Sequence, residues 1–248
     1  MESDYHPELD KTDELDGNKA NYYQNLIGIL QWVVELGRID IALEVSTMAW
    51  FNCNPRTGHL RNTLRILMCL KGHTKSKFVM DCCKRDIDQF TFPEYNWTRY
   101  YPGAAEVIPD DMPCPLGELV QITVFANASF AGNMVTHKSV TGILIFVNGP
   151  PIMWLSKRQV TLETSTFGSE FVALRVAVEM VEALLCYKLR MFGVLSDGPA
   201  NAFCDNLEHR VEFYFAFVYT QEEAQFCELR QGPFLHCCWH HSCYKGAR

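Results

Sequence analysis

Hydrophobic residues in the first third of the chain recur every three or four positions, the spacing of amphipathic helices. The first such run begins at Tyr22. Its apolar face consists of Tyr23, Leu26, Ile27, Leu30, Val33 and Val34. The pattern therefore predicts a helix with one buried face.

Two further helices are predicted before residue 80. The second has Asp40 as its expected N-cap, and the third follows Asn54-Pro55 and ends near Gly72. Their inward residues are expected to be Ile41, Val45 and Met48 in the second and Leu60, Leu64 and Leu67 in the third. Together the three runs predict a small helical unit over residues 21–80.

Beyond residue 118 the hydrophobic period changes to two, which is typical of strands. Residues Val120–Asn127 alternate apolar and polar side chains, and Thr141–Val147 is rich in branched residues. The turn sequence Asn148-Gly149-Pro150 separates the second strand from a third at Ile152–Leu155. The three strands predict an antiparallel meander.

A long helix should follow the meander, because Thr164-Ser165-Thr166 offers a cap. Its apolar stripe contains Phe167, Phe171, Leu174, Val178, Val181 and Leu185, with Ala173, Ala177 and Leu184 beside it. Glu170 lies at the top of this stripe, an unusual place for an acid. After Gly193, a short strand at Ala202–Cys204 delivers Asp205 at its tip.

Two segments show neither the helical spacing nor the strand period of hydrophobic residues. The first 20 residues hold seven acids and two lysines and predict an acidic, disordered tail, and the proline-rich residues 81–117 predict a connector. The chain is thus expected to comprise a tail at 1–20, the helical segment at 21–80, the connector at 81–117, an α/β domain at 118–207 and a divergent end at 208–248.

Composition narrows the function classes. A hydrophobic content of 48% can fill a core, which excludes disorder over most of the chain. The net charge of −7 excludes a general polyanion binder, so any nucleic-acid contact needs a local basic patch. Lys157 and Arg158 could form such a patch or be solvated charges. We expect an intracellular protein, cytoplasmic or nuclear and not secreted. The N-terminus lacks the basic-then-apolar order of a signal peptide, and no apolar run is long enough for a membrane-spanning helix.

Glu170 and Asp205 come from separate elements that could meet at one edge of the sheet. Clustered acids need a divalent cation for neutralisation, and two cations about 3.5–4 Å apart can hold a phosphodiester during cleavage. Two simpler readings remain open on the residues alone. Glu170 could have a structural partner, and Asp205 could serve as a turn residue.

Several short blocks in the second half of the chain are distinctive: 124–133 (VFANASFAGN), 139–142 (SVTG), 154–159 (WLSKRQ), 163–166 (ETST), 169–174 (SEFVAL) and 204–206 (CDN). In this order they resemble the RNase H region of copia-type LTR retrotransposon polyproteins. Blocks at 23–28, 40–42 and 64–72 resemble the segment that joins the reverse transcriptase to that region. The resemblance covers most of residues 22–206.

The resemblance implies a magnesium-dependent cut in the RNA strand of an RNA–DNA hybrid. The family's helix acid falls on Glu170 and its fourth-strand acid on Asp205, whereas its first-strand acid is replaced by Asn127. Because asparagine is a neutral ligand, metal affinity and activation of the nucleophile should both fall. The resemblance therefore implies a damaged catalytic site.

The end of the chain departs from the family after Asn206. Cysteines and histidines crowd the last residues, but Cys237 and Cys238 are adjacent and no Cys-x-x-Cys spacing occurs, which disfavours a zinc site. We hypothesise a frameshift just after Asn206, since a shifted frame permits a lysine- and histidine-containing segment like that of the family. The nucleotide sequence of the gene tests whether the reading frame shifts at this point.

Together these observations predict an α/β fold, an incomplete RNase H-like mixed sheet with a flanking helix, preceded by a small helical segment. The expected site contains Glu170, Asp205 and Asn127, with Glu170 and Asp205 binding Mg²⁺ if any activity is retained. The expected partner is an RNA–DNA hybrid or other nucleic acid. The alternative is a non-catalytic module that binds nucleic acid or a protein partner.

Overall fold

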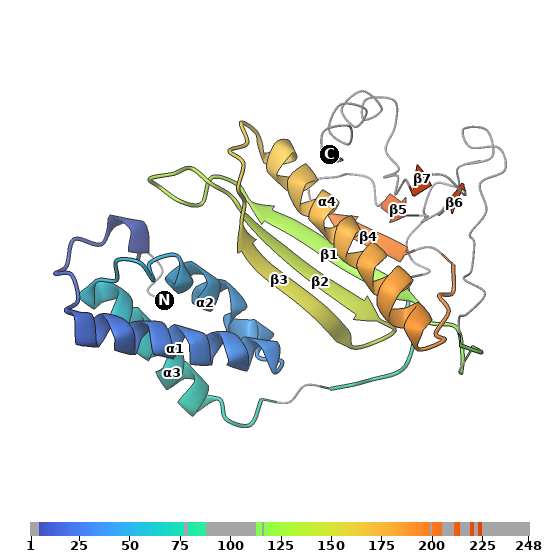
Figure 1. Ribbon diagram of the computed structural model, residues 1–248, viewed down its shortest axis with the longest axis horizontal. Coiled ribbons are helices and arrows are strands. Elements are labelled where there is room, and N and C mark those ends of the chain that lie inside the picture. Colours follow the sequence, from blue (N-terminus) through green and yellow to red (C-terminus); the bar gives the residue numbers. More distant parts are fainter. Residues whose placement is uncertain are drawn as a thin grey trace.

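The chain folds into a helical unit and a sheet with a long helix across one face (Figure 1). The computed structural model describes residues 5–76, 79–87, 113–115, 117–198, 200–204, 211–213, 219–220 and 223–224. Most of the predicted connector and most of the divergent end, including its cysteine- and histidine-rich stretch, lie outside the described residues. In this part of the chain, no helix has the length and apolar character needed to cross a membrane.

The helical unit contains α1 (Gly17–Glu35), α2 (Ala42–Ala49) and α3 (Thr57–Gly72). Its core is formed by Tyr23, Ile27, Leu30, Val34, Ile41, Val45, Met48 and Ile66. Tyr23 is fully buried, and its hydroxyl donates to the Met48 carbonyl at 2.6 Å. Burial raises the pKa of Tyr23 to about 12. The predicted helices are confirmed, and the buried faces of the first two are as expected.

The starts of α1 and α2 differ from the predictions, because Asp16 caps the first helix and Asp40 does not cap the second. Helix α1 begins at Gly17, because Asp16 accepts a hydrogen bond from the Lys19 backbone and caps it. Asp40 does not cap α2. Its carboxylate instead pairs with Arg38, which lowers the pKa of Asp40, and a short 3-10 turn at Ile39–Ile41 leads into the helix.

Of the leucine stripe expected on α3, Leu60 and Leu67 pack against the helical core beside the buried Ile66, but polar residues share the buried side of this helix. Leu64 is 38% exposed, whereas His59, Asn62 and Thr63 are buried. The His59 ring accepts from the Arg56 backbone N–H at Nδ1 and donates from Nε2 to the Pro7 carbonyl. Because both ring nitrogens have partners, this polar side chain can lie inside.

The Pro7 carbonyl belongs to the segment before α1, and the prediction of a solvated tail is wrong for residues 5–16. Pro7 is buried in a 3-10 turn at Pro7–Leu9. The Asp10 carboxylate accepts from the Tyr5 hydroxyl at 2.6 Å and from the Thr12 backbone and hydroxyl. The Arg56 guanidinium donates to the Thr12 carbonyl and to Glu14. The acidic segment is thus tied to the start of α3.

The sheet has the order β3-β2-β1-β4-β5. Its strands are β1 (Ile122–Ser129), β2 (Val140–Val147), β3 (Pro151–Arg158), β4 (Ala200–Cys204) and β5 (Val211–Phe213), and β6 (Tyr219–Thr220) pairs separately with β7 (Glu223–Ala224). Strands β1, β2 and β3 form the predicted antiparallel meander, and β4 runs parallel to β1. The protein is therefore a mixed α/β structure, as expected.

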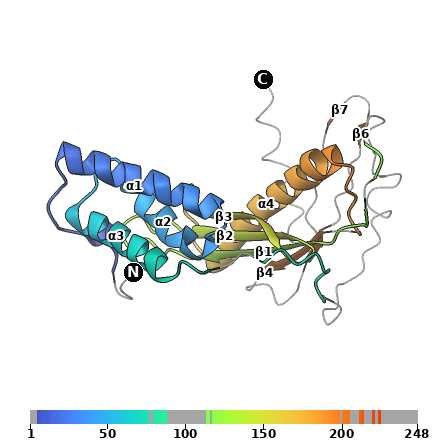
Figure 2. The same ribbon diagram turned by 90° about the horizontal axis from the view of Figure 1, so that it is seen from below.

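Helix α4 (Thr166–Ala183) crosses one face of the sheet (Figures 1 and 2). Ser165 caps it, as predicted, by accepting from the Gly168 backbone. Its buried residues pack on the alternating apolar residues of β1, namely Ile122, Val124 and Ala126. Phe167 is 49% exposed and does not join the stripe. A π-helical turn at Leu184–Leu189 continues the helix towards Gly193.

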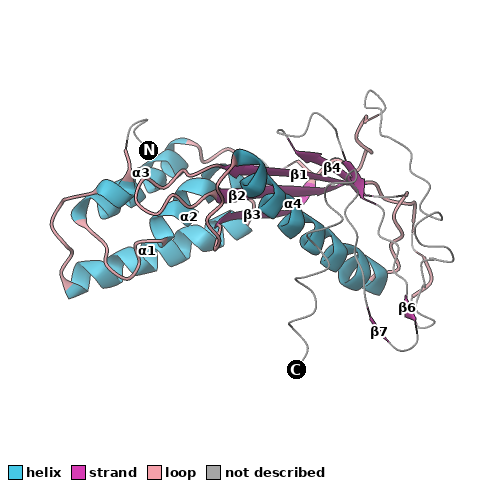
Figure 3. Ribbon diagram, turned by 90° about the horizontal axis from the view of Figure 1, so that it is seen from above, coloured by secondary structure: helices cyan, strands magenta, loops and turns pink. Residues whose placement is uncertain are grey.

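The helical unit lies beside the other side of β3 (Figure 3). The Ser46 hydroxyl on α2 donates to the Ser156 carbonyl at 2.8 Å, and Trp154 packs against the helical core. Met153 and Leu155, which alternate with Trp154, pack instead against the α4 side. Strand β3 therefore connects two hydrophobic cores.

Gly58→Ala should destabilise the protein, although alanine is normally the better helix former. A Cβ at residue 58 would lie 1.7 Å from Asp10 Oδ2, so the carboxylate would have to leave its hydrogen bonds. We expect a loss of about 1–3 kcal/mol in urea denaturation. Gly28→Ala, where nothing lies within 4 Å, should instead gain about 0.5–1 kcal/mol. Equal changes in stability from Gly58→Ala and Gly28→Ala would contradict the proposed contact. The contact would also be contradicted if Gly58→Ala destabilised an Asp10→Ala variant as much as it destabilises the parent.

Asp10→Asn should lower stability most at neutral pH. Burial raises the pKa of Asp10, but the hydrogen bonds from Thr12 and Tyr5 together outweigh it and hold that pKa below its ordinary value. The folded state therefore gains stability from the ionised carboxylate above about pH 5 and loses it as pH falls below about 4. Thermal denaturation of parent and variant across this range should show converging melting temperatures at low pH. A difference that grows on acidification would refute the assignment.

Candidate functional site

Four segments end or begin at one edge of the domain. Strand β1 ends there, β2 begins there because it is antiparallel, and the end of β3 leads directly into α4. The parallel strand β4 brings its own carboxyl end to the same edge. Polar residues from distant parts of the sequence can therefore meet at this place, as the strand order of the sequence suggested.

Glu170 is the acid that the fold places at this edge. It lies one turn into α4, its side chain is buried, and it is 4% exposed. Its carboxylate oxygen Oε2 accepts a hydrogen bond from the Cys204 thiol at 3.1 Å. Cys204 is the last described residue of β4 and pairs with Ala126 of β1. The expected position of Glu170 on the apolar stripe is confirmed, and the contact joins α4 to the tip of β4.

Asn127 follows Ala126 on β1, one position past the strand pair that carries Cys204. Its side chain is exposed, whereas Ala126 and Ala128 are buried, because successive residues of a strand point to opposite faces. Its partner across β2 is Gly142, so no side chain stands opposite it. Asn127 therefore presents a neutral amide on the face of the sheet opposite the one that α4 covers, and the described strand does not bring it together with Glu170.

Asp205 lies outside the described residues, which include β4 only as far as Cys204. The predicted meeting of Glu170 and Asp205 therefore stays a prediction. What the structure adds is the contact of Glu170 with Cys204, the residue directly before Asp205.

The described residues at this edge do not fit a magnesium site by themselves. Magnesium is held in proteins by carboxylate and other oxygen ligands, whereas the contact between α4 and the end of β4 pairs the Glu170 carboxylate with the Cys204 thiol. Among the residues that the structure describes, no three histidine, cysteine or acidic side chains form a group that could hold a metal. No step of a reaction can be derived from these residues alone.

A buried polar network beside Glu170 was missed by the sequence analysis. Gln159 is 6% exposed, and its amide nitrogen donates to the Thr141 hydroxyl at 3.0 Å and to the Ser169 carbonyl at 2.8 Å. Its backbone N–H donates to the Ser139 carbonyl. The network links β2, the end of β3 and the first turn of α4. The burial of Gln159 cannot be recognised from periodicity. It follows two basic residues at a strand end, so the local sequence is typical of an exposed segment.

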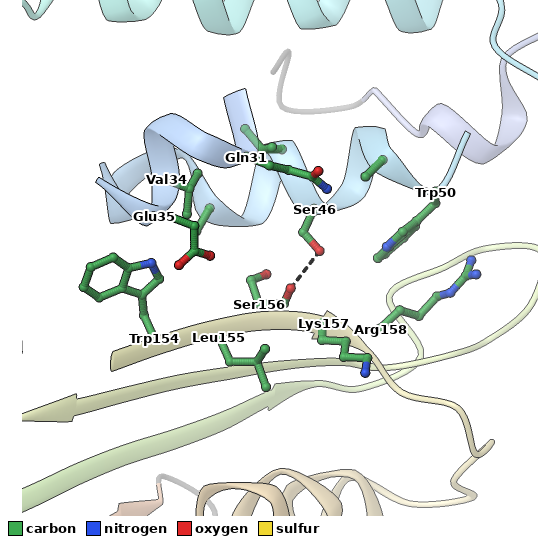
Figure 4. Close-up of a pocket in the computed structure, with 13 residues that line it drawn as sticks. Gln31, Val34, Glu35, Ser46, Trp50, Trp154, Leu155, Ser156, Lys157 and Arg158 are labelled. Atoms are coloured by element: carbon green, nitrogen blue, oxygen red, sulfur yellow. Dashed lines mark hydrogen bonds between the residues drawn. The ribbon is translucent and has the colours of Figure 1, made fainter. Parts of the chain in front are cut away.

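A pocket was also missed. It lies between α1, α2 and β3 and encloses about 530 Å³ (Figure 4). Trp50 and Arg158 lie at one end, and Glu35 and Trp154 lie at the other. The Arg158 guanidinium sits 4.8 Å from the centre of the Trp50 ring. Arg158 is therefore half-buried on an aromatic face and is not a freely solvated charge.

Comparisons of the chain with models of protein families, with curated proteins and with solved structures found no match.

Gln159→Leu should destabilise the domain by about 1–3 kcal/mol, because the Ser169 carbonyl and the Thr141 hydroxyl would lose their buried donor. Urea denaturation followed by circular dichroism measures this loss. Gln31→Leu, at an exposed position of α1, is the matched control and should change stability by less than about 0.5 kcal/mol. Two equally small effects would show that the network contributes nothing to stability.

Proposed function

We propose that the chain is part of a copia-type retrotransposon polyprotein, whose RNase H-like domain has lost metal-dependent cleavage of RNA–DNA hybrids. The proposal rests on the sequence resemblance. The observation that best supports it is the burial of Glu170 against Cys204, at the edge where β1, α4 and β4 meet. In the family the metal-binding carboxylates come from these same three elements.

The strand arrangement is compatible with this proposal. An antiparallel meander followed by a helix and a strand parallel to the first is the order that such a domain requires. A single helix carries a buried acid to the tip of the fourth strand.

Loss of cleavage follows from the charge at residue 127. Two-cation cleavage needs several carboxylates to hold both metals and to lower the pKa of the attacking water. Asn127 offers a neutral oxygen where the family has an acid, which weakens the binding of both ions. Removal of one member of such a unit usually abolishes most of the rate.

The parent protein should therefore leave an RNA–DNA hybrid intact in either Mg²⁺ or Mn²⁺. Asn127→Asp should restore part of the pocket and tighten Mn²⁺ binding by about tenfold, measured by titration calorimetry or Mn²⁺ paramagnetic resonance. Asn18→Asp, at an exposed position of α1, adds the same charge far from the sheet and controls for net charge.

Two results would refute the proposal. Cleavage by the parent that Glu170→Gln abolishes would show a surviving nuclease. Equal Mn²⁺ affinity of the Asn127→Asp and Asn18→Asp variants would show that residue 127 does not belong to a metal pocket.

A further inference from the structure

Helix α1 has a second apolar face, on the side opposite its buried residues. This face, which we call the outer stripe, consists of four large side chains that are exposed: Tyr22 (50%), Ile29 (55%), Trp32 (63%) and Leu36 at the C-cap (63%). Helix α1 lies on the outside of the helical unit (Figure 2). The folding of the helical unit therefore leaves the outer stripe uncovered.

The spacing of the outer stripe is that of a seam between two helices. Its members, together with the exposed Asn25, occupy positions 22, 25, 29, 32 and 36, which are alternately three and four residues apart. Two helices that pack along their lengths meet through side chains with this repeat, and a single polar residue in the seam fixes their register. The element that fits the outer stripe is therefore another helix.

The charges of α1 indicate an uncharged partner. Residues 20–34 contain no acidic or basic side chain, although the outer face of a surface helix normally carries charges. Lys19, directly before this run, forms an ion pair with Asp16 at 3.3 Å. A lipid surface is disfavoured, because helices that lie on membranes are rich in basic residues on their polar side. A second copy of α1 has the same uncharged stripe and needs no charge for recognition.

The exposed area suits a pair of identical chains. Four large side chains exposed to this extent present on the order of 450 Å² of apolar surface, a patch size that is often functional. A two-fold contact uses the same patch on both chains. With the neighbouring polar side chains, two stripes would bury roughly 1,000 Å² in total, which is the lower limit for a specific interface.

We propose that two copies of the chain form a dimer through the outer stripe of α1, with the two helices antiparallel. Trp32 of one copy packs on Tyr22 of the second copy, and Ile29 packs beside Asn25. At Gly28, where a Cβ would meet nothing within 4 Å, the two backbones can approach closely. The antiparallel arrangement also brings opposite ends of the two helix dipoles together. The proposal does not depend on the nuclease ancestry.

Sedimentation equilibrium of the full chain tests the proposal, with a reductant present so that exposed cysteines do not link copies. The parent should sediment at twice the mass of one chain and dissociate on dilution. Ile29→Glu should weaken the dimer by about tenfold or more, because it places a charge in the middle of the stripe. Met68→Glu adds the same charge at a side chain that is 71% exposed on α3, and this variant should sediment like the parent.

Two charged variants test the antiparallel arrangement. Trp32→Glu and Tyr22→Lys should each be monomeric alone, with the circular dichroism spectrum of the parent, because both side chains lie outside the hydrophobic cores. An equimolar mixture of the two should dimerise, since the new glutamate of one chain then meets the new lysine of the other. A mixture that stays monomeric would overturn the antiparallel pairing.

The dimer itself is refuted by a parent that remains monomeric at about 100 μM, a concentration at which even weak specific complexes form. A dimer that persists unchanged in Ile29→Glu refutes it equally. Binding of a monomeric parent to neutral phosphatidylcholine vesicles would assign the outer stripe to a lipid surface instead. Glu170→Gln should leave the dimer unchanged, which separates this test from that of the nuclease proposal.

Discussion

The packing of α4 on β1 determines where the polar groups of this protein lie. Alternate residues of β1 are apolar and fill one face of the sheet, and α4 has a stripe of small and branched residues that covers them. At about 25 cal/mol per Å² of buried apolar surface, this contact is a major source of the domain's stability. Because Glu170 belongs to the same stripe, its burial is a consequence of the packing.

The elements of the fold could be predicted where the hydrophobic period was strong. The period of two predicted β1, β2 and β3, and the turn chemistry at Asn148-Gly149-Pro150 predicted how β2 and β3 connect. The sequence Thr164-Ser165-Thr166 predicted a cap for α4, and Ser165 provides it. These features are local in sequence, so neighbouring residues are sufficient to specify them.

The failures concern residues whose partners lie far away in the chain. Nothing near His59 shows that the distant Pro7 carbonyl will bind its second ring nitrogen, so the burial of this side chain could not be predicted. The acidic residues before α1 looked like a free tail for the same reason. At the candidate site, Glu170 could be found from its place on the apolar stripe, whereas Gln159 and the pocket at Trp50 and Trp154 depend on tertiary contacts.

The parallel pairing of β1 with β4 has a consequence for the order in which the protein folds. Strands β1 to β3 and helix α4 are joined by short connections and can assemble through contacts between near neighbours in the sequence. Strand β4 must return across the whole of α4 to pair with β1, which carries a larger cost in loop-closure entropy. We therefore expect the edge that contains Glu170 and Cys204 to be completed late in folding. A truncated or altered C-terminal region would leave the meander and its helix able to collapse, but with the central strand open to association with other chains.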